Sequence, residues 1–148
     1  MTADARLVEE VSALDDALCA SLAALVPQLS KSADPLTRAV LEEIVASSAT
    51  TLFVAKDPSG GVVGMLTLAT FRAPTGVRAW IEDVVVDTTE RHRGTGAALV
   101  RAALAKADAV GARTVDLTSN PARTEANALY RKLGFNSRET NVYRFEPS

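Results

Sequence analysis

The first clear pattern along the chain is a set of leucines at helical spacing. They recur at every third or fourth position, which places them on one face of a helix: Leu14, Leu18, Leu22 and Leu25. Ser12 precedes this run as a candidate N-cap, and we expect the helix to end near Pro27. A similar apolar periodicity predicts a second helix over residues 35–47.

The middle of the chain alternates between turn signals and segments rich in β-branched residues. Three strands are predicted, over residues 50–56, 62–71 and 77–86. Residues 57–61, with the sequence DPSGG, indicate a hairpin turn, and Pro74 with Gly76 breaks the chain before the third strand. Residues 6–11 fit either a short first strand or the start of a helix.

Helices and strands alternate after residue 86. We expect a helix from Gly96 to Gly111, a strand over 113–118, a helix over 123–133 and a last strand over 141–145. Small and branched apolar residues share one side of the first of these helices: Val100, Ala103, Ala107 and Val110. An antiparallel meander followed by β-α-β-α-β predicts the α+β class, with a mixed sheet covered by helices in one domain over 1–148.

Composition and charge narrow the functional classes. The chain has 148 residues and a formal net charge of −2, which argues against bulk binding of nucleic acid. Cys19 is its only cysteine and His92 its only histidine, so we expect neither a disulfide nor a metal site. The first ten residues lack the apolar run of a signal peptide, and no segment approaches the roughly 20 apolar residues that span a bilayer. We therefore expect a cytoplasmic protein that does not bind membranes.

A basic, glycine-punctuated turn is the strongest chemical signal. The strand ending at residue 86 is followed by RHRGTG, residues 91–96, and then by an alanine-rich helix. The first turn of a helix has unsatisfied N–H groups and a partial positive charge, which favour an anion. Gly94 and Gly96 leave no Cβ between these amides and a ligand, and Arg91 and Arg93 add positive charge. This pattern predicts a phosphate-binding turn.

Two motifs resemble those of the GNAT superfamily of acetyl-CoA-dependent N-acetyltransferases. Residues 91–96 match the Arg/Gln-x-x-Gly-x-Gly/Ala signature, and residues 126–135, ANALYRKLGF, match the family's Ala-x-x-Leu-Tyr-x-x-Leu-Gly-Phe ending. One helix and one strand separate the two motifs, as in the family. The resemblance implies a mostly antiparallel sheet with a splayed fourth and fifth strand, flanked by about four helices.

The resemblance also implies acetyl-CoA as the co-substrate and no metal. In the family, backbone groups of the fourth strand pair with the pantetheine amides, and the turn holds the pyrophosphate. The residues carried over to these roles are Val84, Val85, Val86, Arg91, His92, Arg93, Gly94, Thr95, Gly96 and Ala97. A backbone N–H at Val84 or Val85 would stabilise the oxyanion that develops on the thioester.

One position departs from the family pattern. Many relatives carry asparagine seven residues before the motif tyrosine, whereas this chain has Arg123 there. Asn120 or Asn127 is expected to replace that contact with CoA, or Arg123 itself contacts a phosphate or an acidic substrate. A solvated Arg123 in the first turn of its helix is the simplest structural alternative.

Acetyl transfer to an amine requires two proton movements. Tyr130 matches the family's general acid near the CoA sulfur, and an ordinary tyrosine pKa of about 10 keeps the phenol protonated at pH 7. Glu82 is our candidate for the base, with Asp83 or a water as alternatives. Because strand side chains alternate, Glu82 should share a face with Val84 and Asp83 with Val85, unless a bulge intervenes. His92 is read as an exposed or phosphate-adjacent side chain.

The acceptor is the least defined part of the hypothesis. We expect a small primary amine, with a protein lysine or N-terminal amine as the second choice. Residues 81–86, IEDVVV, also resemble the corresponding strand of glucosamine-6-phosphate N-acetyltransferases, which suggests an amino sugar. A non-catalytic, acyl-CoA-binding regulatory module is the alternative from another class, and a homodimer is a further expectation, since relatives commonly dimerise.

Overall fold

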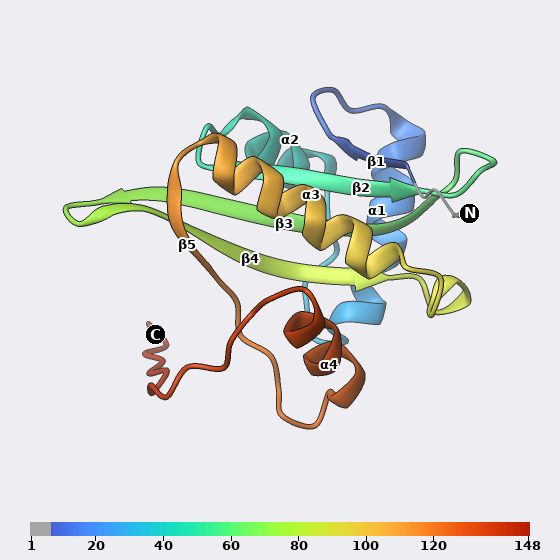
Figure 1. The fold of residues 1–148 in the computed structure, drawn as a ribbon. Helices are drawn as coiled ribbons and strands as arrows, with labels where there is room; N and C mark the ends of the chain where they lie inside the picture. Colours follow the sequence, from blue (N-terminus) through green and yellow to red (C-terminus); the bar gives the residue numbers. More distant parts are fainter. Residues whose placement is uncertain (1–6) are drawn as a thin grey trace. The chain divides into compact units, whose positions relative to one another are not determined.

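The computed structural model describes residues 7–148, so Arg6, where the first expected element begins, lies outside the described part. Five strands and four helices are found there (Figure 1). The strands are β1 (Leu7–Glu10), β2 (Thr50–Lys56), β3 (Val62–Ala73), β4 (Gly76–Val86) and β5 (Ala112–Asp116). The α-helices are α1 (Asp16–Leu29), α2 (Arg38–Ala46), α3 (Thr95–Ala109) and α4 (Thr124–Lys132). The chain forms two compact units, Met1–Leu117 and Thr118–Ser148, each of which is described by itself.

The first unit contains one mixed sheet in the order β1-β2-β3-β4-β5. Pairing is antiparallel from β1 to β4 and parallel between β4 and β5. The parallel ladder ends where Trp80 lies opposite Asp116, although β4 continues to Val86. The sheet therefore opens between the fourth and fifth strands, as the sequence resemblance implies.

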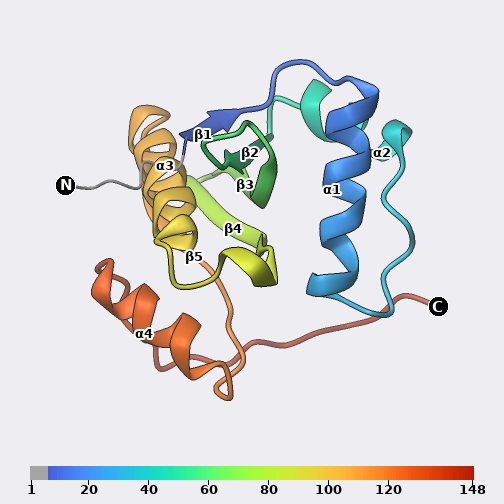
Figure 2. The same cartoon turned by 90° about the vertical axis from the view of Figure 1, so that its right-hand side faces the viewer.

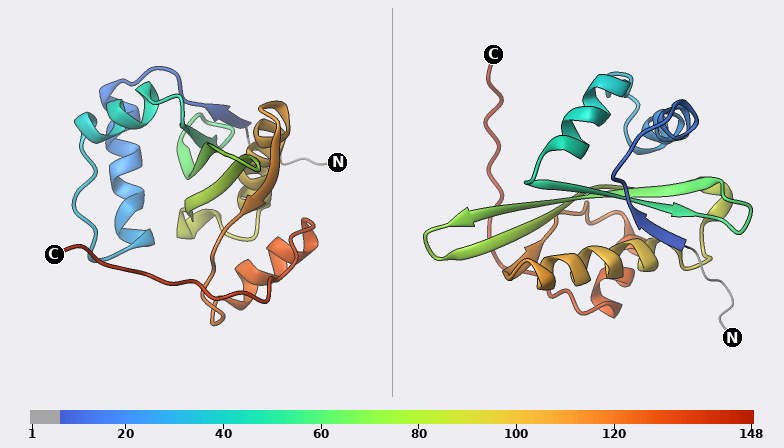
Figure 3. Two further views of the ribbon diagram at one scale, coloured as in Figure 1. Left: turned by 90° about the vertical axis from the view of Figure 1, so that its left-hand side faces the viewer. Right: turned by 90° about the horizontal axis from the view of Figure 1, so that it is seen from above.

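Helices cover both faces of this sheet. Figures 2 and 3 show α1 and α2 on one face and α3 on the other. On the first face, three helix leucines pack against the strands in a cluster with these members: Leu22, Leu25, Leu41, Leu52, Val54, Met65 and Val85. On the second face, Leu99, Val100 and Ala103 of α3 are fully buried. The periodic apolar positions therefore supply much of the core, as predicted, except that Val110 is largely exposed.

The first helix begins and ends later than expected. Asp15, rather than Ser12, is the N-cap, and its carboxylate accepts a hydrogen bond of 2.8 Å from the Leu18 N–H. Pro27 lies inside the helix, which continues to Leu29 although a proline removes one backbone hydrogen bond and crowds the carbonyl of the preceding turn. The added turn carries Gln28 to the loop that follows β4.

A β-bulge interrupts β4 immediately after Glu82. Glu82 lies opposite Thr67 of β3 and Val85 lies opposite Met65, so Asp83 and Val84 together face a single residue. Asp83 adopts φ 54°, which is left-handed and uncommon for a residue with a side chain. Because Thr67 and Met65 are two apart on their strand, Glu82 and Val85 share a face. The prediction from simple alternation, that Glu82 shares a face with Val84, is therefore wrong, because the bulge intervenes.

The second unit holds α4 and an extended tail. Gly134 has φ 101°, and Phe135 turns back so that its ring meets Tyr130 edge-on, with centroids 5.8 Å apart. The expected strand over 141–145 is not formed, and its side chains Val142, Tyr143 and Phe145 are exposed. A strand needs a hydrogen-bonded neighbour, and residues 141–145 pair with none of the described strands.

No helix among residues 7–148 has the length and apolar character needed to cross a bilayer.

Gly64 allows α3 to pack tightly on the sheet, which gives a first prediction. A Cβ at Gly64 would lie 3.1 Å from both the Leu99 side chain and the Val85 carbonyl oxygen. Because the backbone oxygen cannot move aside, we expect Gly64→Ala to lower the free energy of unfolding by about 1–3 kcal/mol. Urea denaturation of both proteins measures this loss.

Gly61→Ala is the matched control for this prediction. A Cβ at Gly61 would meet only the half-buried Asp57 carboxylate, at 3.3 Å, and the end of a side chain can shift more easily than a backbone oxygen. Both substitutions restrict the unfolded chain equally, so that contribution cancels between them. Equal stability of the two variants would show that α3 does not depend on the missing Cβ of Gly64.

Candidate functional site

The basic turn connects β4 to α3 through two left-handed residues. A short 3-10 segment, Thr88–Glu90, leads to His92 with φ 66° and to Gly94 with φ 81°, which is the N-cap of α3. Glycine adopts this conformation freely, whereas histidine does so at some cost. The side chains of Arg91, His92 and Arg93 are exposed, which agrees with the exposed position expected for His92.

Backbone amides at the start of α3 lack hydrogen-bond partners. The first helical bond runs from the Ala98 N–H to the Gly94 carbonyl, at 3.0 Å, so the N–H groups of Thr95, Gly96 and Ala97 are not used within the helix. Among the described residues, the Thr95 hydroxyl oxygen is also buried without a partner. Unpaired donors beside two arginines form a site suited to an anion such as a phosphate.

The approach to this turn is fixed by α1. The Gln28 side-chain oxygen accepts a bond of 3.0 Å from the Thr88 N–H, and its amide nitrogen donates to Asp87 at 3.4 Å. Asp87 in turn accepts a bond of 3.0 Å from the Thr89 N–H. This bond lowers the pKa of the Asp87 carboxyl below its ordinary value of 3.8, so the group stays ionised at neutral pH.

The end of β4 has one open backbone edge. Beyond Trp80 no described strand pairs with β4 on the side away from β3. Val85 buries its side chain in the core, while Val84 and Val86 are half-buried. A segment with packed side chains and unpaired N–H and C=O groups is able to bind an extended ligand through its backbone.

Glu82 lies next to this open edge and contacts a tryptophan. Its side chain is exposed, and its carboxylate accepts a hydrogen bond of 2.7 Å from the indole N–H of Trp80. Trp80 was not among the residues predicted for the site, although the spacing of two along a strand places both side chains on one face. Asp83, the alternative base, is also exposed, but it lies at the bulge.

Tyr130 is the buried residue of the second unit. Its side chain is 8% exposed and packs against Phe135. Burial raises the pKa of the phenol above its ordinary value of 10.0, while the Arg123 guanidinium acts in the opposite direction. The phenol is therefore protonated at neutral pH and can donate a proton.

The two candidate asparagines shape the loop before α4. The Asn120 side-chain oxygen accepts a bond of 2.8 Å from the Ala122 N–H, and the Asn127 amide donates to the Asn120 carbonyl at 3.1 Å. Arg123 stands at the N-cap of α4, exposed and without a capping side-chain bond. Its solvated position agrees with the simplest structural alternative.

The candidate residues fall into two groups. Glu82, Val84–Val86 and the turn over 91–97 follow one another along β4 and the start of α3 in the first unit. Asn120, Asn127 and Tyr130 belong to the second unit. Cys19 is half-buried and packs against the core.

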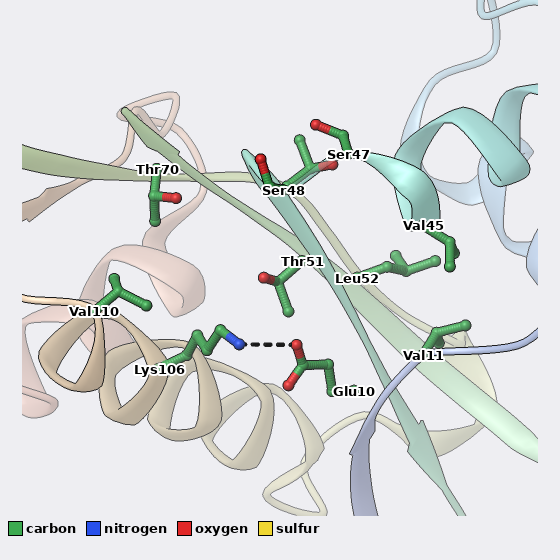
Figure 4. A pocket seen from close by; sticks show the side chains of 11 residues that line it. Glu10, Val11, Val45, Ser47, Ser48, Thr51, Leu52, Thr70, Lys106 and Val110 are labelled. Carbon is green, nitrogen blue, oxygen red and sulfur yellow. Dashed lines mark hydrogen bonds and ion pairs between the residues drawn. The ribbon is translucent and has the colours of Figure 1, made fainter. Parts of the chain in front are cut away.

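A cavity of about 240 Å³ lies at the other end of α3 (Figure 4). An ion pair of 2.9 Å between Lys106 and Glu10 stands within it. None of the predicted site residues is among those that line this cavity.

Within residues 7–148, no group of three or more His, Cys, Asp or Glu side chains is arranged to hold a metal ion.

Several known proteins have a similar fold. The chain aligns over 95% of its length with 99% of an acetyltransferase from Trypanosoma brucei, at 26% identity and a TM-score of 0.77. An aminoglycoside acetyltransferase from an uncultured soil metagenomic sample, solved with sisomicin, matches 96% of this chain over 95% of its own, at 20% identity and a TM-score of 0.82. Glucosamine-6-phosphate N-acetyltransferase from Arabidopsis thaliana matches 94% of this chain over 98% of its own, at 18% identity and a TM-score of 0.78.

The sequence model of the Acetyltransferase (GNAT) family matches residues 20–135, a span that includes both motifs, the open strand pair and the glycine turn. The chain belongs to the acetyltransferase (GNAT) family and is an acyltransferase.

Proposed function

We propose that this protein transfers an acetyl group from acetyl-CoA to the primary amine of a small molecule, by direct attack in a ternary complex. The observation that carries the proposal is the row of unpaired amides at the start of α3, which follows directly on the open edge of β4. In a GNAT acetyltransferase, these two features match the two halves of a CoA molecule: the pyrophosphate and the extended pantetheine arm.

The residues of the first unit fit acetyl-CoA. The N–H groups of Thr95, Gly96 and Ala97 and the charges of Arg91 and Arg93 would hold the pyrophosphate, with His92 and Gly94 giving the turn its shape. The buried Thr95 hydroxyl, which lacks a described partner, provides one further donor. The backbone of Val84–Val86 would pair with the pantetheine amides. When bound, acetyl-CoA supplies a thioester carbonyl as the acetyl donor.

Glu82 would remove the proton that the attacking ammonium must lose. The carboxylate is exposed beside the open edge of β4, so an amine from solvent is able to approach it. A nearby backbone N–H, at Val84 or Val85, would stabilise the negative charge on the carbonyl oxygen. Asp83, which is also exposed, would serve as a counter-ion for the incoming amine.

Tyr130 would supply the proton that the departing CoA thiolate gains. Its raised pKa keeps the phenol protonated at neutral pH. For the contact that relatives make through asparagine, Asn120 and Asn127, which both order the loop before α4, are the candidates. Arg123, exposed at the N-cap of α4, would be the alternative contact for a phosphate or an acidic group.

The acceptor is proposed to be a small amine rather than a protein. Amino sugars are the first compounds to test, because residues 81–86 resemble the matching strand of glucosamine-6-phosphate N-acetyltransferases, and such an enzyme is among the similar folds. A lysine peptide tests the protein-acetyltransferase alternative.

Calorimetry with acetyl-CoA and with CoA, in the absence of acceptor, is the decisive first experiment. Micromolar binding of both, followed by release of CoA with glucosamine 6-phosphate, sisomicin or a lysine peptide, supports the proposal and assigns the acceptor class. Binding of CoA without transfer to any amine would favour a regulatory acyl-CoA-binding protein. Absence of binding would refute the proposed cofactor site.

Arg91→Ala should weaken CoA binding about tenfold, because one charge-assisted hydrogen bond to a phosphate is lost. Calorimetric dissociation constants measure the change. Arg101→Ala is the control, since Arg101 is an exposed arginine on α3 outside the turn and its removal changes the net charge equally. Equal affinities of the two variants would remove Arg91 from the pyrophosphate site.

Tyr130→Phe should lower kcat about a hundredfold and leave the affinity for acetyl-CoA nearly unchanged, since only a proton donor is removed. The phenylalanine ring preserves the edge contact with Phe135. Tyr143→Phe is the matched control, because Tyr143 is the other tyrosine and is exposed in the tail. Unaltered turnover in Tyr130→Phe would refute the acid role.

Glu82→Gln should abolish the rise of activity with pH that an ionisable base produces, and should lower kcat about a hundredfold near neutral pH. The measurement is the pH profile of kcat/KM. Asp83→Asn, which changes the neighbouring exposed carboxylate, is expected to retain the rise. If Asp83→Asn loses the rise and Glu82→Gln keeps it, the base is Asp83. If both variants keep the rise, neither residue is the base.

A further inference from the structure

The geometry points to Trp80 as the positioning residue for the carboxylate of Glu82. This inference rests on the proposed function, in which Glu82 is the base. We infer that the indole N–H holds one carboxylate oxygen in place and leaves the other free to receive a proton from the amine.

The contact between the two side chains is short and directed. The Trp80 Nε1 lies 2.7 Å from the Glu82 Oε1, which is the distance of a charge-assisted hydrogen bond. Glutamate is a flexible side chain, and at an exposed position it would sample several rotamers. A single bond to Oε1 removes much of that freedom without using Oε2. Among residues 7–148, no other residue forms a hydrogen bond with the Glu82 side chain.

Trp80 is well placed to act as the fixed partner. It is paired on both sides, with Ala69 of β3 and with Asp116 of β5. Glu82 is paired on one side only, with Thr67, and the bulge begins at the next residue. The tryptophan is the last residue of β4 that the sheet holds from both edges, whereas the glutamate stands on the part that has lost one neighbour. The hydrogen bond therefore connects a mobile carboxylate to a rigid backbone.

Few charged groups of β3, β4, β5 and α1 lie beside this pair of side chains. Asp116 is the strand partner of Trp80, Asp83 follows Glu82, and Arg78 precedes Trp80 by two residues and donates to Thr75 at 2.6 Å. The β3 residues opposite the pair, Thr67 and Ala69, are uncharged. From α1, which also packs on β4, the only charged residue is Asp16, paired with Arg38 at 2.7 Å. A titration near Trp80 must therefore distinguish Glu82 from Asp116 and Asp83.

Trp80 is the only tryptophan of the chain, so its fluorescence reports this contact directly. We expect the emission of the intact protein to change as the pH is lowered and the carboxylate beside the indole loses its charge. Glu82→Gln should abolish that change, while Asp116→Asn and Asp83→Asn should retain it. A titration that survives in Glu82→Gln would overturn the inference. This readout needs neither acetyl-CoA nor an acceptor.

A double-mutant cycle tests whether the contact matters for turnover. With the acceptor that reacts fastest in the amine panel, Trp80→Phe should lower kcat about tenfold, the effect of losing one hydrogen bond to a charged group. The KM for acetyl-CoA should stay unchanged. In the Glu82→Gln background, Trp80→Phe should have no further effect, because the group that it positions is already absent. Trp80→His, which keeps a ring N–H, should recover part of the activity.

An equal loss from Trp80→Phe in both backgrounds would overturn the inference, since the tryptophan would then act independently of Glu82. Full activity of Glu82→Gln together with a fluorescence change that depends on Glu82 is a different result. It would refute Glu82 as the base and the positioning role with it, while acetyl-CoA binding, measured separately, would still stand.

Discussion

The parallel ladder between β4 and β5 stops at Trp80 and Asp116, and the chemistry proposed for the first unit depends on where it stops. If pairing continued to Val86, the backbone groups of the last strand residues would be used inside the sheet. Because it ends, one strand keeps a row of unpaired donors and acceptors at the point where it enters the basic turn. The N–H and C=O groups of such an open edge need a ligand or water as partner, because unpaired backbone groups cost free energy.

An edge of this kind persists only if other contacts hold the strand. Val85, which follows the bulge, provides one such contact, since its side chain packs in the core with Leu22 and Leu25 of α1. Gln28, at the end of the same helix, holds the loop after β4 through Thr88 and Asp87. Helix α1 therefore takes over part of the role that a neighbouring strand has elsewhere in the sheet. The longer-than-expected helix, which passes Pro27, is what brings Gln28 to that loop.

The sequence patterns were sufficient for the order of the elements and for most of their bounds. Strand β2 and the basic turn lie where periodicity and glycine spacing placed them, because these signals are local. The bulge at Asp83 could not be predicted in the same way. It is a property of the register between β3 and β4, and nothing in residues 81–86 alone shows that two residues will face one. The same holds for the segment 141–145, whose β-branched and aromatic composition favours a strand but does not supply a neighbour.

The bulge has a chemical consequence that simple alternation would miss. It moves Val85 to the face of Glu82, so the core residue that anchors the strand and the exposed carboxylate lie on the same side of the sheet. The proposed acetyl transfer requires a proton acceptor and a proton donor at the same pH. Glu82 is exposed and held by an indole N–H, whereas Tyr130 is buried and its pKa is raised by desolvation. In the proposed mechanism the exposed carboxylate is open to an amine from solvent, while burial keeps the phenol protonated at neutral pH.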